Sequence, residues 1–286
     1  MNVRAFIQRH PVGVYFTLAF LISYGGFVVV DGPRLVRGEA LRSLDALLLF
    51  PALVVGVGLL GIILTAVVDG RNGLRDLLAR LRRADRFSVG WYAAALLIPP
   101  VVILAVLFGL SVLVSPRFAP GFFPLGIVFG LVPGFFEEIG WMGFAFPKMR
   151  LNMEKRSVLA TGVILGALWG LWHAPVVDYL GAAAPHGASW LPFFLSFIAL
   201  VTAMRVLIVW IYSNTQSVLL AQLMHVSSTG CLVVFSAIHA SPAQETLWYA
   251  TYAAALWVIV ALVVAVYGKG LVRLRPLGSV ALAQSA

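Results

Sequence analysis

The chain has 286 residues, of which 61% are apolar and 11% are charged, and its formal net charge is +9. This mix lies far outside that of soluble globular domains, so it excludes a water-soluble fold and predicts an all-α, polytopic helical bundle in a lipid bilayer. No patch of alternating basic and aromatic residues accompanies the charge, which excludes nucleic acid as a partner and points to anionic lipid headgroups.

Eight apolar runs follow one another along the chain, each near the ~20 residues that a helix needs to cross the hydrocarbon layer. They lie at 12–30, 46–68, 88–114, 122–144, 157–178, 190–212, 215–237 and 246–267. The first run is too long for a signal peptide and lacks a small-residue cleavage site, so we expect it to be retained. Pro99 and Pro100 predict a kink or a short re-entrant piece in the third run. Short connections leave residues 1–286 as a single membrane domain.

Lys and Arg side chains are unevenly distributed between alternate connections. With both termini in the cytoplasm, fifteen lie in inner segments and four in outer ones, as the positive-inside rule predicts. The inner set is Arg4, Arg9, Arg71, Arg75, Arg80, Arg82, Arg83, Arg86, Lys148, Arg150, Lys155, Arg156, Lys269, Arg273 and Arg275, and the outer set is Arg34, Arg37, Arg42 and Arg117. We therefore expect an integral protein of a bacterial inner membrane with both termini cytoplasmic.

Segment 71–86, RNGLRDLLARLRRADR, has four leucines at helical spacing among its arginines: Leu74, Leu77, Leu78 and Leu81. This pattern predicts an amphipathic helix that lies on the inner membrane surface. A membrane-hugging connector is the favoured interpretation, and a specific lipid site is the alternative.

Ionisable side chains within the apolar runs are few, and each costs about 2.5–3.5 kcal/mol at membrane depth. They are Glu137, Glu138, His173, Arg205 and His225, with Gln222, Ser227, Ser228 and Thr229 beside the last. A functional site is the favoured interpretation, and structural hydrogen bonding between helices is the alternative. For Arg205 we expect a snorkelling position near the inner interface, with compensation of a glutamate as the alternative. His10, His186 and His239 fall in the predicted tail or outer loops.

Two glycine stripes lie on the helix faces that carry these residues. Positions four apart share one side of a helix, so Gly126, Gly130 and Gly134 align with Glu138. Gly162, Gly166 and Gly170 form a second stripe that leads to His173. Such stripes let backbones approach closely, and we expect them to bring the fourth and fifth runs together around the glutamates, although they are also ordinary packing devices. In the seventh run His225 and Thr229 share a polar face, so three helices direct polar groups at a common interior.

Two chemistries fit these residues. A glutamate in an apolar pocket can act as a general base toward water, while histidines and a hydroxyl orient the water and stabilise an oxyanion; this chemistry needs no cofactor. Alternatively Glu137, His173 and His225 form a carboxylate and two-histidine set for zinc. The HExxH signature is missing, and the lone Cys231 excludes a cysteine-based metal cage.

Three motifs resemble those of the CPBP family of intramembrane proteases, which includes the type II CAAX prenyl endopeptidases and bacteriocin-immunity (Abi) relatives. Glu137 and Glu138 in FFEEIGWMG match the family's EExxxR, His173 in ALWGLWHAP matches FxxxH, and His225 in LLAQLMHVSS matches HxxxN. The resemblance covers residues 90–237, which it marks as the catalytic half. It implies that Glu137 and His173 activate a water, while His225 and position 229 face the oxyanion.

Three positions depart from the family motifs. Met142 replaces the arginine, so the expected pair between Glu138 and that arginine is absent. Trp169 replaces the phenylalanine of the second motif. Thr229 replaces the asparagine of the third and has one hydroxyl donor where the amide has two, which predicts weaker oxyanion stabilisation.

Three functions follow from these observations. The first is an intramembrane endopeptidase that acts on a membrane-tethered or lipid-modified peptide. The second is a catalytically weakened relative that serves as an immunity or partner-binding protein, as the departures at Met142 and Thr229 suggest. The third is a transporter that uses the same groups as a proton relay, for which the sequence offers no inverted repeat.

Overall fold

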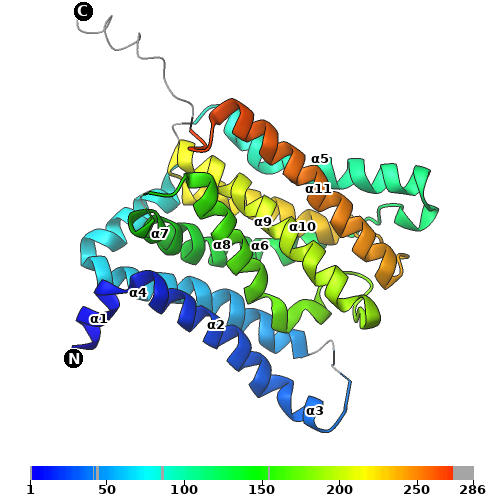
Figure 1. Ribbon diagram of the computed structural model, residues 1–286, viewed down its shortest axis with the longest axis horizontal. Helices are drawn as coiled ribbons and strands as arrows, with labels where there is room; N and C mark the ends of the chain where they lie inside the picture. Colours follow the sequence, from blue (N-terminus) through cyan, green and yellow to red (C-terminus); the bar gives the residue numbers. More distant parts are fainter. Residues whose placement is uncertain (1, 41, 43–44, 85–86, 154, 273–286) are drawn as a thin grey trace, which may run out of the picture.

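A computed structural model describes residues 2–40, 42, 45–84, 87–153 and 155–272. Within these residues the fold is entirely helical and contains no β-strand, which confirms the predicted all-α class (Figure 1). The α-helices are α1 (Val3–Arg9), α2 (Pro11–Val30), α3 (Gly32–Val36), α4 (Ala46–Arg82), α5 (Val89–Leu113), α6 (Gly126–Gly140), α7 (Phe146–Asn152), α8 (Val158–Trp172), α9 (Trp190–Thr215), α10 (Val218–Val234) and α11 (Pro242–Tyr267). Shorter pieces are the 3-10 turns η2 (Pro116–Phe118), η4 (Ala174–Tyr179) and η5 (Gly187–Ser189), and the π-helical turn η3 (Trp141–Ala145).

Six helical segments among the described residues are long and apolar enough to cross a membrane, judged by length and composition. Two shorter apolar helices, α8 and α10, complete the eight runs of the sequence. Their 15 and 17 residues correspond to about 22 and 26 Å at ~1.5 Å per residue, somewhat less than the hydrocarbon thickness. The chain is therefore an integral membrane protein. Of the two histidines of the predicted site, His225 lies on α10 and His173 directly follows the last residue of α8.

The basic segments assigned to the inside lie at one end of the bundle. The Gln8 side chain of α1 bonds the Val67 carbonyl of α4 at 3.3 Å. The start of α8 meets the end of α11 where Leu159 N donates to the Lys269 carbonyl at 3.1 Å. In Figure 1, α1, α7 and the last turn of α11 all lie toward the left of the view. The predicted arrangement, with these segments on a common face, is therefore present for the described residues, whereas Arg86, Arg273 and Arg275 lie outside them.

A buried histidine organises the opposite end of the bundle. His186 precedes η5 in the connection between α8 and α9, and its Nε2 lies 3.0 Å from Oε2 of Glu245 in the first turn of α11. The same carboxylate accepts hydrogen bonds from the backbone N–H groups of Ala182 and Ala183, at 2.7 and 3.0 Å. Sequence analysis placed His186 in an outer loop, but its burial and its partner follow only from the docking of that loop on α11.

Helix α4 breaks at Gly70, where φ is +65° and ψ is −153°, a conformation that side chains other than glycine rarely adopt. The helix beyond this break is the predicted amphipathic segment and ends at Arg82, with residues 85 and 86 outside the description. Leu77 and Arg80 on this segment are buried against the bundle. The interpretation as a connector that only rests on the membrane surface is therefore wrong for this face, because one of its arginines enters the protein.

Helix α5 runs without a break through Pro99 and Pro100, so it is not re-entrant. A proline lacks an N–H and frees the carbonyl four residues earlier, which is costly in a membrane unless another donor replaces it. For Pro100 that carbonyl belongs to Leu96, and it accepts a hydrogen bond of 2.8 Å from the Ser227 hydroxyl of α10. Ser227, one of the polar residues noted beside His225, therefore has a structural role.

The glycine stripes join different helices from those we expected. A side chain at Gly130 would collide with the α10 backbone at Gly230 and Val226, and one at Gly126 would lie 2.7 Å from Val234 N. On α8, a Cβ at Gly166 would lie 2.7 Å from Thr202 Cα of α9. The stripes therefore pack α6 on α10 and α8 on α9, and the prediction that they join α6 directly to α8 is wrong.

Candidate functional site

Glu138 lies at the centre of a buried ion cluster to which three helices contribute. Its side chain is fully buried on α6, and its Oε1 accepts a hydrogen bond from Nδ1 of His225 on α10 at 2.7 Å. Nη1 of Arg205 on α9 donates to both carboxylate oxygens, at 2.9 Å to Oε1 and 2.7 Å to Oε2. A buried charge is tolerated when it is paired and hydrogen-bonded, and Glu138 meets both conditions.

Arg205 does not snorkel to the interface, so that expectation is wrong. Its side chain has no exposed surface, and its Cζ lies 4.2 Å from the ring centroid of Trp169, in a cation–π arrangement. The alternative, that Arg205 compensates a glutamate, agrees with the geometry. The guanidinium comes from α9 and pairs with Glu138, while the motif's arginine position holds Met142, which is itself fully buried.

Glu137 has a different environment from its neighbour. Its Oε2 accepts two indole N–H groups, from Trp169 at 2.8 Å and from Trp141 at 3.2 Å. Among the described residues no donor bonds its other oxygen, Oε1, and no Lys or Arg is paired with it. Glu137 thus has one oxygen held in place and one available to a small molecule such as water.

The two histidines each use Nδ1 for an internal hydrogen bond. Nδ1 of His173 lies 2.8 Å from its own helix's Trp169 carbonyl, which can only accept, so this nitrogen carries the proton. Nδ1 of His225 faces the Glu138 carboxylate in the same way. Partners of this kind fix the orientation of an imidazole and direct Nε2 outward. Glu137, His173 and His225 meet at Trp169, whose ring centroid lies 5.6 Å from that of His173 and 5.0 Å from that of His225.

Thr229 lies one helical turn after His225 and is partly exposed. Its hydroxyl has no hydrogen-bond partner among the described residues, whereas nearby Gln222 donates to the Phe135 carbonyl of α6 at 2.7 Å. Gln222 thus supports the packing of α10 on α6. Thr229 shares the helix face of His225 but makes no hydrogen bond to the ion cluster.

Arg80 of α4 donates hydrogen bonds to the π-helical turn η3, which follows the glutamates. Pro147 has no N–H, so one carbonyl of the preceding turn loses its helical partner: that of Gly143 in α-helical geometry or that of Met142 in π-helical geometry. Arg80 donates to both, with Nη2 3.0 Å from Gly143 O and Nη1 3.5 Å from Met142 O. It also donates to the Tyr212 hydroxyl at 2.8 Å. Sequence analysis missed this support, although Pro147 in a membrane helix was a signal that an outside donor was needed.

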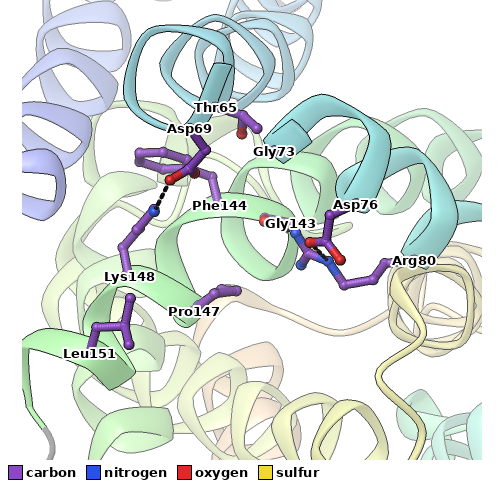
Figure 2. A pocket seen from close by; sticks show the side chains of 10 residues that line it. All are labelled: Thr65, Asp69, Gly73, Asp76, Arg80, Gly143, Phe144, Pro147, Lys148 and Leu151. Carbon is purple, nitrogen blue, oxygen red and sulfur yellow. Dashed lines mark hydrogen bonds and ion pairs between the residues drawn. The ribbon is translucent and has the colours of Figure 1, made fainter. Parts of the chain in front are cut away.

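A pocket of about 220 Å³ lies beside this support, between α4 and α7 (Figure 2). Two ion pairs line it: Asp69 with Lys148 at 2.6 Å, and Asp76 with Arg80 at 2.9 Å. Figure 2 shows both pairs facing the hollow, with Phe144 and Pro147 on its wall. The first pair joins α4 before the Gly70 break to α7, and the second lies within α4 beyond the break, where Arg80 also bonds the π-helical turn.

The predicted zinc set is Glu137, His173 and His225. No group of three or more His, Cys, Asp or Glu residues in the described part of the chain is placed to hold a metal ion. Nδ1 of both histidines is bonded within the protein, so Nε2 of each ring is the nitrogen left for another partner. Zinc at this site stays a prediction, and the mechanism below uses the protein's own residues.

Comparison with known proteins agrees with the motif residues. The family described as "Type II CAAX prenyl endopeptidase Rce1-like" matches residues 119–231, a range that contains Glu137, Glu138, His173, His225 and Thr229. CAAX prenyl protease 2 of Methanococcus maripaludis is 25% identical over 235 residues, which cover 74% of this chain and 80% of the relative. Both matches agree with the resemblance of the motifs to CPBP proteins and support an intramembrane protease in general.

Proposed function

We propose that this protein is an endopeptidase that hydrolyses a peptide bond of a membrane-tethered or lipid-modified substrate with a water molecule activated by Glu137. The observation that carries the proposal is the difference between the two adjacent glutamates. Glu138 is neutralised by Arg205 and bonded to His225, whereas Glu137 has an oxygen without a donor and no cationic partner. A general base needs such an available oxygen within reach of its water.

The reaction follows from these positions. Glu137 takes a proton from water, and the water oxygen bonds to the carbon of the scissile carbonyl, whose oxygen becomes negative. His173 orients the water through Nε2, and His225 donates to the oxyanion through Nε2, with help from the Thr229 hydroxyl. The proton on Glu137 then moves to the leaving nitrogen as the C–N bond breaks. The products are a carboxylate and an amine, and Glu137 regains its charge.

The substrate and location are part of the same proposal. The relative in Methanococcus maripaludis is named a CAAX prenyl protease, which favours a lipid-modified peptide that reaches the site from the membrane. The end of the bundle with the basic segments faces the cytoplasm in this proposal, in a bacterial inner membrane. The bilayer itself holds the substrate's anchor, so one end of the substrate is already placed before cleavage.

The test is a comparison of membrane peptides from cells that contain the wild-type protein or the Glu137→Gln variant. Glutamine keeps the size of the side chain but cannot take the proton, so cleavage of the substrate should fall by ~10²–10⁴-fold while the protein still folds. Glu39→Gln, which changes a partly exposed acid in a loop, is the matched control and should cleave normally. Unchanged cleavage by Glu137→Gln would refute the proposal. Stoichiometric zinc that is lost in His173→Ala would instead establish a metal mechanism.

A second candidate, a catalytically weak member that binds a partner, is favoured by the single hydroxyl at Thr229. Thr229→Asn introduces the amide that the family has at this position, and an added oxyanion donor is worth up to ~10²–10³-fold in kcat. If threonine is a weak substitute, purified Thr229→Asn should cleave faster than wild type. A wild-type protein that cleaves nothing, together with an active Thr229→Asn variant, would favour the partner-binding function.

A further inference from the structure

Trp169 contacts four of the five ionisable groups of the site: Glu137, Arg205, His173 and His225. Its indole N–H donates to Glu137 Oε2 at 2.8 Å, and Arg205 Cζ lies 4.2 Å from the centroid of its ring. Its backbone carbonyl accepts from His173 Nδ1 at 2.8 Å, and its ring meets His225 edge to face. The side chain is 4% exposed. A residue that only fills space would not need both a directed donor and a cation on its face.

The shape of the indole decides which glutamate pairs with the arginine. An indole N–H points outward in the plane of the ring, whereas a cation binds above the plane. Glu137 therefore lies at the edge of Trp169, and Arg205 lies over its face. In this position Arg205 reaches Glu138, to which it is bonded at 2.7 Å, and no ion pair joins it to Glu137.

We propose that Trp169 is a positioning residue that gives the two glutamates their different roles. It holds Glu137 by hydrogen bonding without a net positive charge, and it directs the only fully buried arginine of the described chain to Glu138. The inference rests on the proposed function of Glu137 as the base. It goes beyond that function because the family motif has phenylalanine here, which has no donor to offer.

Indole N–H signals test the contact without any need for activity. The chain has eight tryptophans, and labelling them with ¹⁵N gives a set of indole signals from the full-length protein in detergent micelles. The Trp169 signal is the one that disappears in Trp169→Phe. In Glu137→Gln it should move upfield, because a neutral amide oxygen is a weaker acceptor than a carboxylate. The Trp257 signal, whose N–H bonds the Ala199 carbonyl at 3.1 Å, should not move. A Trp169 signal that is insensitive to Glu137→Gln would overturn the proposal.

Kinetics of Trp169→Phe test the consequence. Phenylalanine keeps an aromatic face for Arg205 but loses the hydrogen bond to Glu137, so kcat should fall about 10- to 100-fold with little change in KM. Trp257→Phe loses one indole donor outside the site and should match wild type. Equal kcat in Trp169→Phe and wild type, or a loss that appears in KM and leaves kcat unchanged, would contradict the role.

The two experiments separate this inference from the proposed function. A wild-type protein without cleavage would refute the endopeptidase proposal, while a Trp169 signal that responds to Glu137→Gln would still establish the contact. An active wild type whose Trp169→Phe variant is equally active would leave the endopeptidase intact and remove the role of Trp169.

Discussion

Two adjacent glutamates have opposite surroundings in this protein. Successive positions on a helix point about 100° apart, so Glu137 and Glu138 face different neighbours although they are joined in sequence. Glu138 faces α9 and α10 and is bonded to Arg205 and His225. One carboxylate oxygen of Glu137 accepts hydrogen bonds from two indole N–H groups. The acid with the cation is suited to holding helices together, and the acid without one is suited to exchanging a proton.

The pair between Arg205 and Glu138 predicts strong coupling between two substitutions. Arg205→Met leaves Glu138 buried without its cation and should lower the free energy of unfolding by about 3–5 kcal/mol. Glu138→Gln in the same background removes the unpaired charge and should restore part of that loss. The measurement is unfolding in mixed micelles of both single variants and of the double variant. Losses that simply add in the double variant would show that the two side chains do not interact.

Asp31, outside the apolar part of α2, predicts a pH dependence of stability. Burial raises the pKa of Asp31, and the Tyr179 hydroxyl, which donates to Oδ1 at 2.9 Å, opposes the shift. A raised pKa means that the folded protein favours the neutral carboxyl, so this stabilisation is present below the unfolded value of about 3.9 and is lost as the pH rises through the folded value. Asp31→Asn should therefore have a higher Tm than wild type at neutral pH.

The measurement that checks this prediction is the pH dependence of the Tm difference between Asp31→Asn and wild type. The Tm difference between Asp31→Asn and wild type should be smallest below the unfolded value of about 3.9 and should grow as the pH rises. Glu39→Gln on the exposed loop is the control. A Tm difference that is independent of pH would contradict the explanation by burial of the charge.

At the level of helices, the site depends on backbone contacts between elements. Ser227 and Arg80 each donate to a carbonyl that a proline has left without its helical partner, on α5 and on the turn after α6. Glycines let α6 approach α10 and let α8 approach α9. These contacts fix the angle and depth at which Glu137, His173 and His225 enter the interior, since each lies on a helix whose position they set.

The close contact at Gly130 predicts that the packing of α6 on α10 is sensitive to the size of the side chain at this position. A methyl group at Gly130 would overlap the Gly230 backbone and lie 2.5 Å from the Val226 carbonyl oxygen, and a backbone cannot rotate away as a side chain can. Gly130→Ala should therefore separate α6 from α10 and lower stability by about 1–3 kcal/mol. Gly109→Ala on α5 is the matched control, because nothing lies within 4 Å of its added methyl group. Unfolding in micelles compares the two, and equal stabilities would show that the close approach is unimportant.

The sequence predicted the helices and the motif residues better than the contacts between them. The apolar runs are explicit in the sequence because a spanning helix must be about 20 residues long, and a charge inside one is rare enough to notice. The partner of Arg205 was not predictable, because Glu138 lies 67 residues away in the chain and the pair depends on how α6 and α9 pack. A glycine stripe shows that a helix has a close neighbour without showing which one. The donor role of Trp169 was missed because its exchange for phenylalanine looked like a change of aromatic ring only.

At the scale of the whole molecule, the two ends of the bundle differ in charge and in construction. One end gathers the ends of α4 and α11, the starts of α8 and α10, and most of the basic residues, with Ser217 donating to the Arg83 carbonyl at 2.6 Å. The other end has the hydrogen bond between His186 and Glu245. It also has the connection of residues 173–189, which contains the 3-10 turns η4 and η5. Such an asymmetry fixes an orientation in a membrane, because basic segments near the helix ends stay on the cytoplasmic side.

This asymmetry predicts the result of cysteine labelling in intact cells. Cys231, the only cysteine, is first replaced in Cys231→Ser, and a single cysteine is then placed at the exposed positions Leu78 and Ala188 at opposite ends of the bundle. A membrane-impermeant maleimide should label Ala188→Cys from outside and leave Leu78→Cys unlabelled until the membrane is opened, because we propose that the amphipathic part of α4 faces the cytoplasm. Labelling of Leu78→Cys alone in intact cells would reverse the orientation, and labelling of both would place the two connections on the same side and contradict the bundle itself.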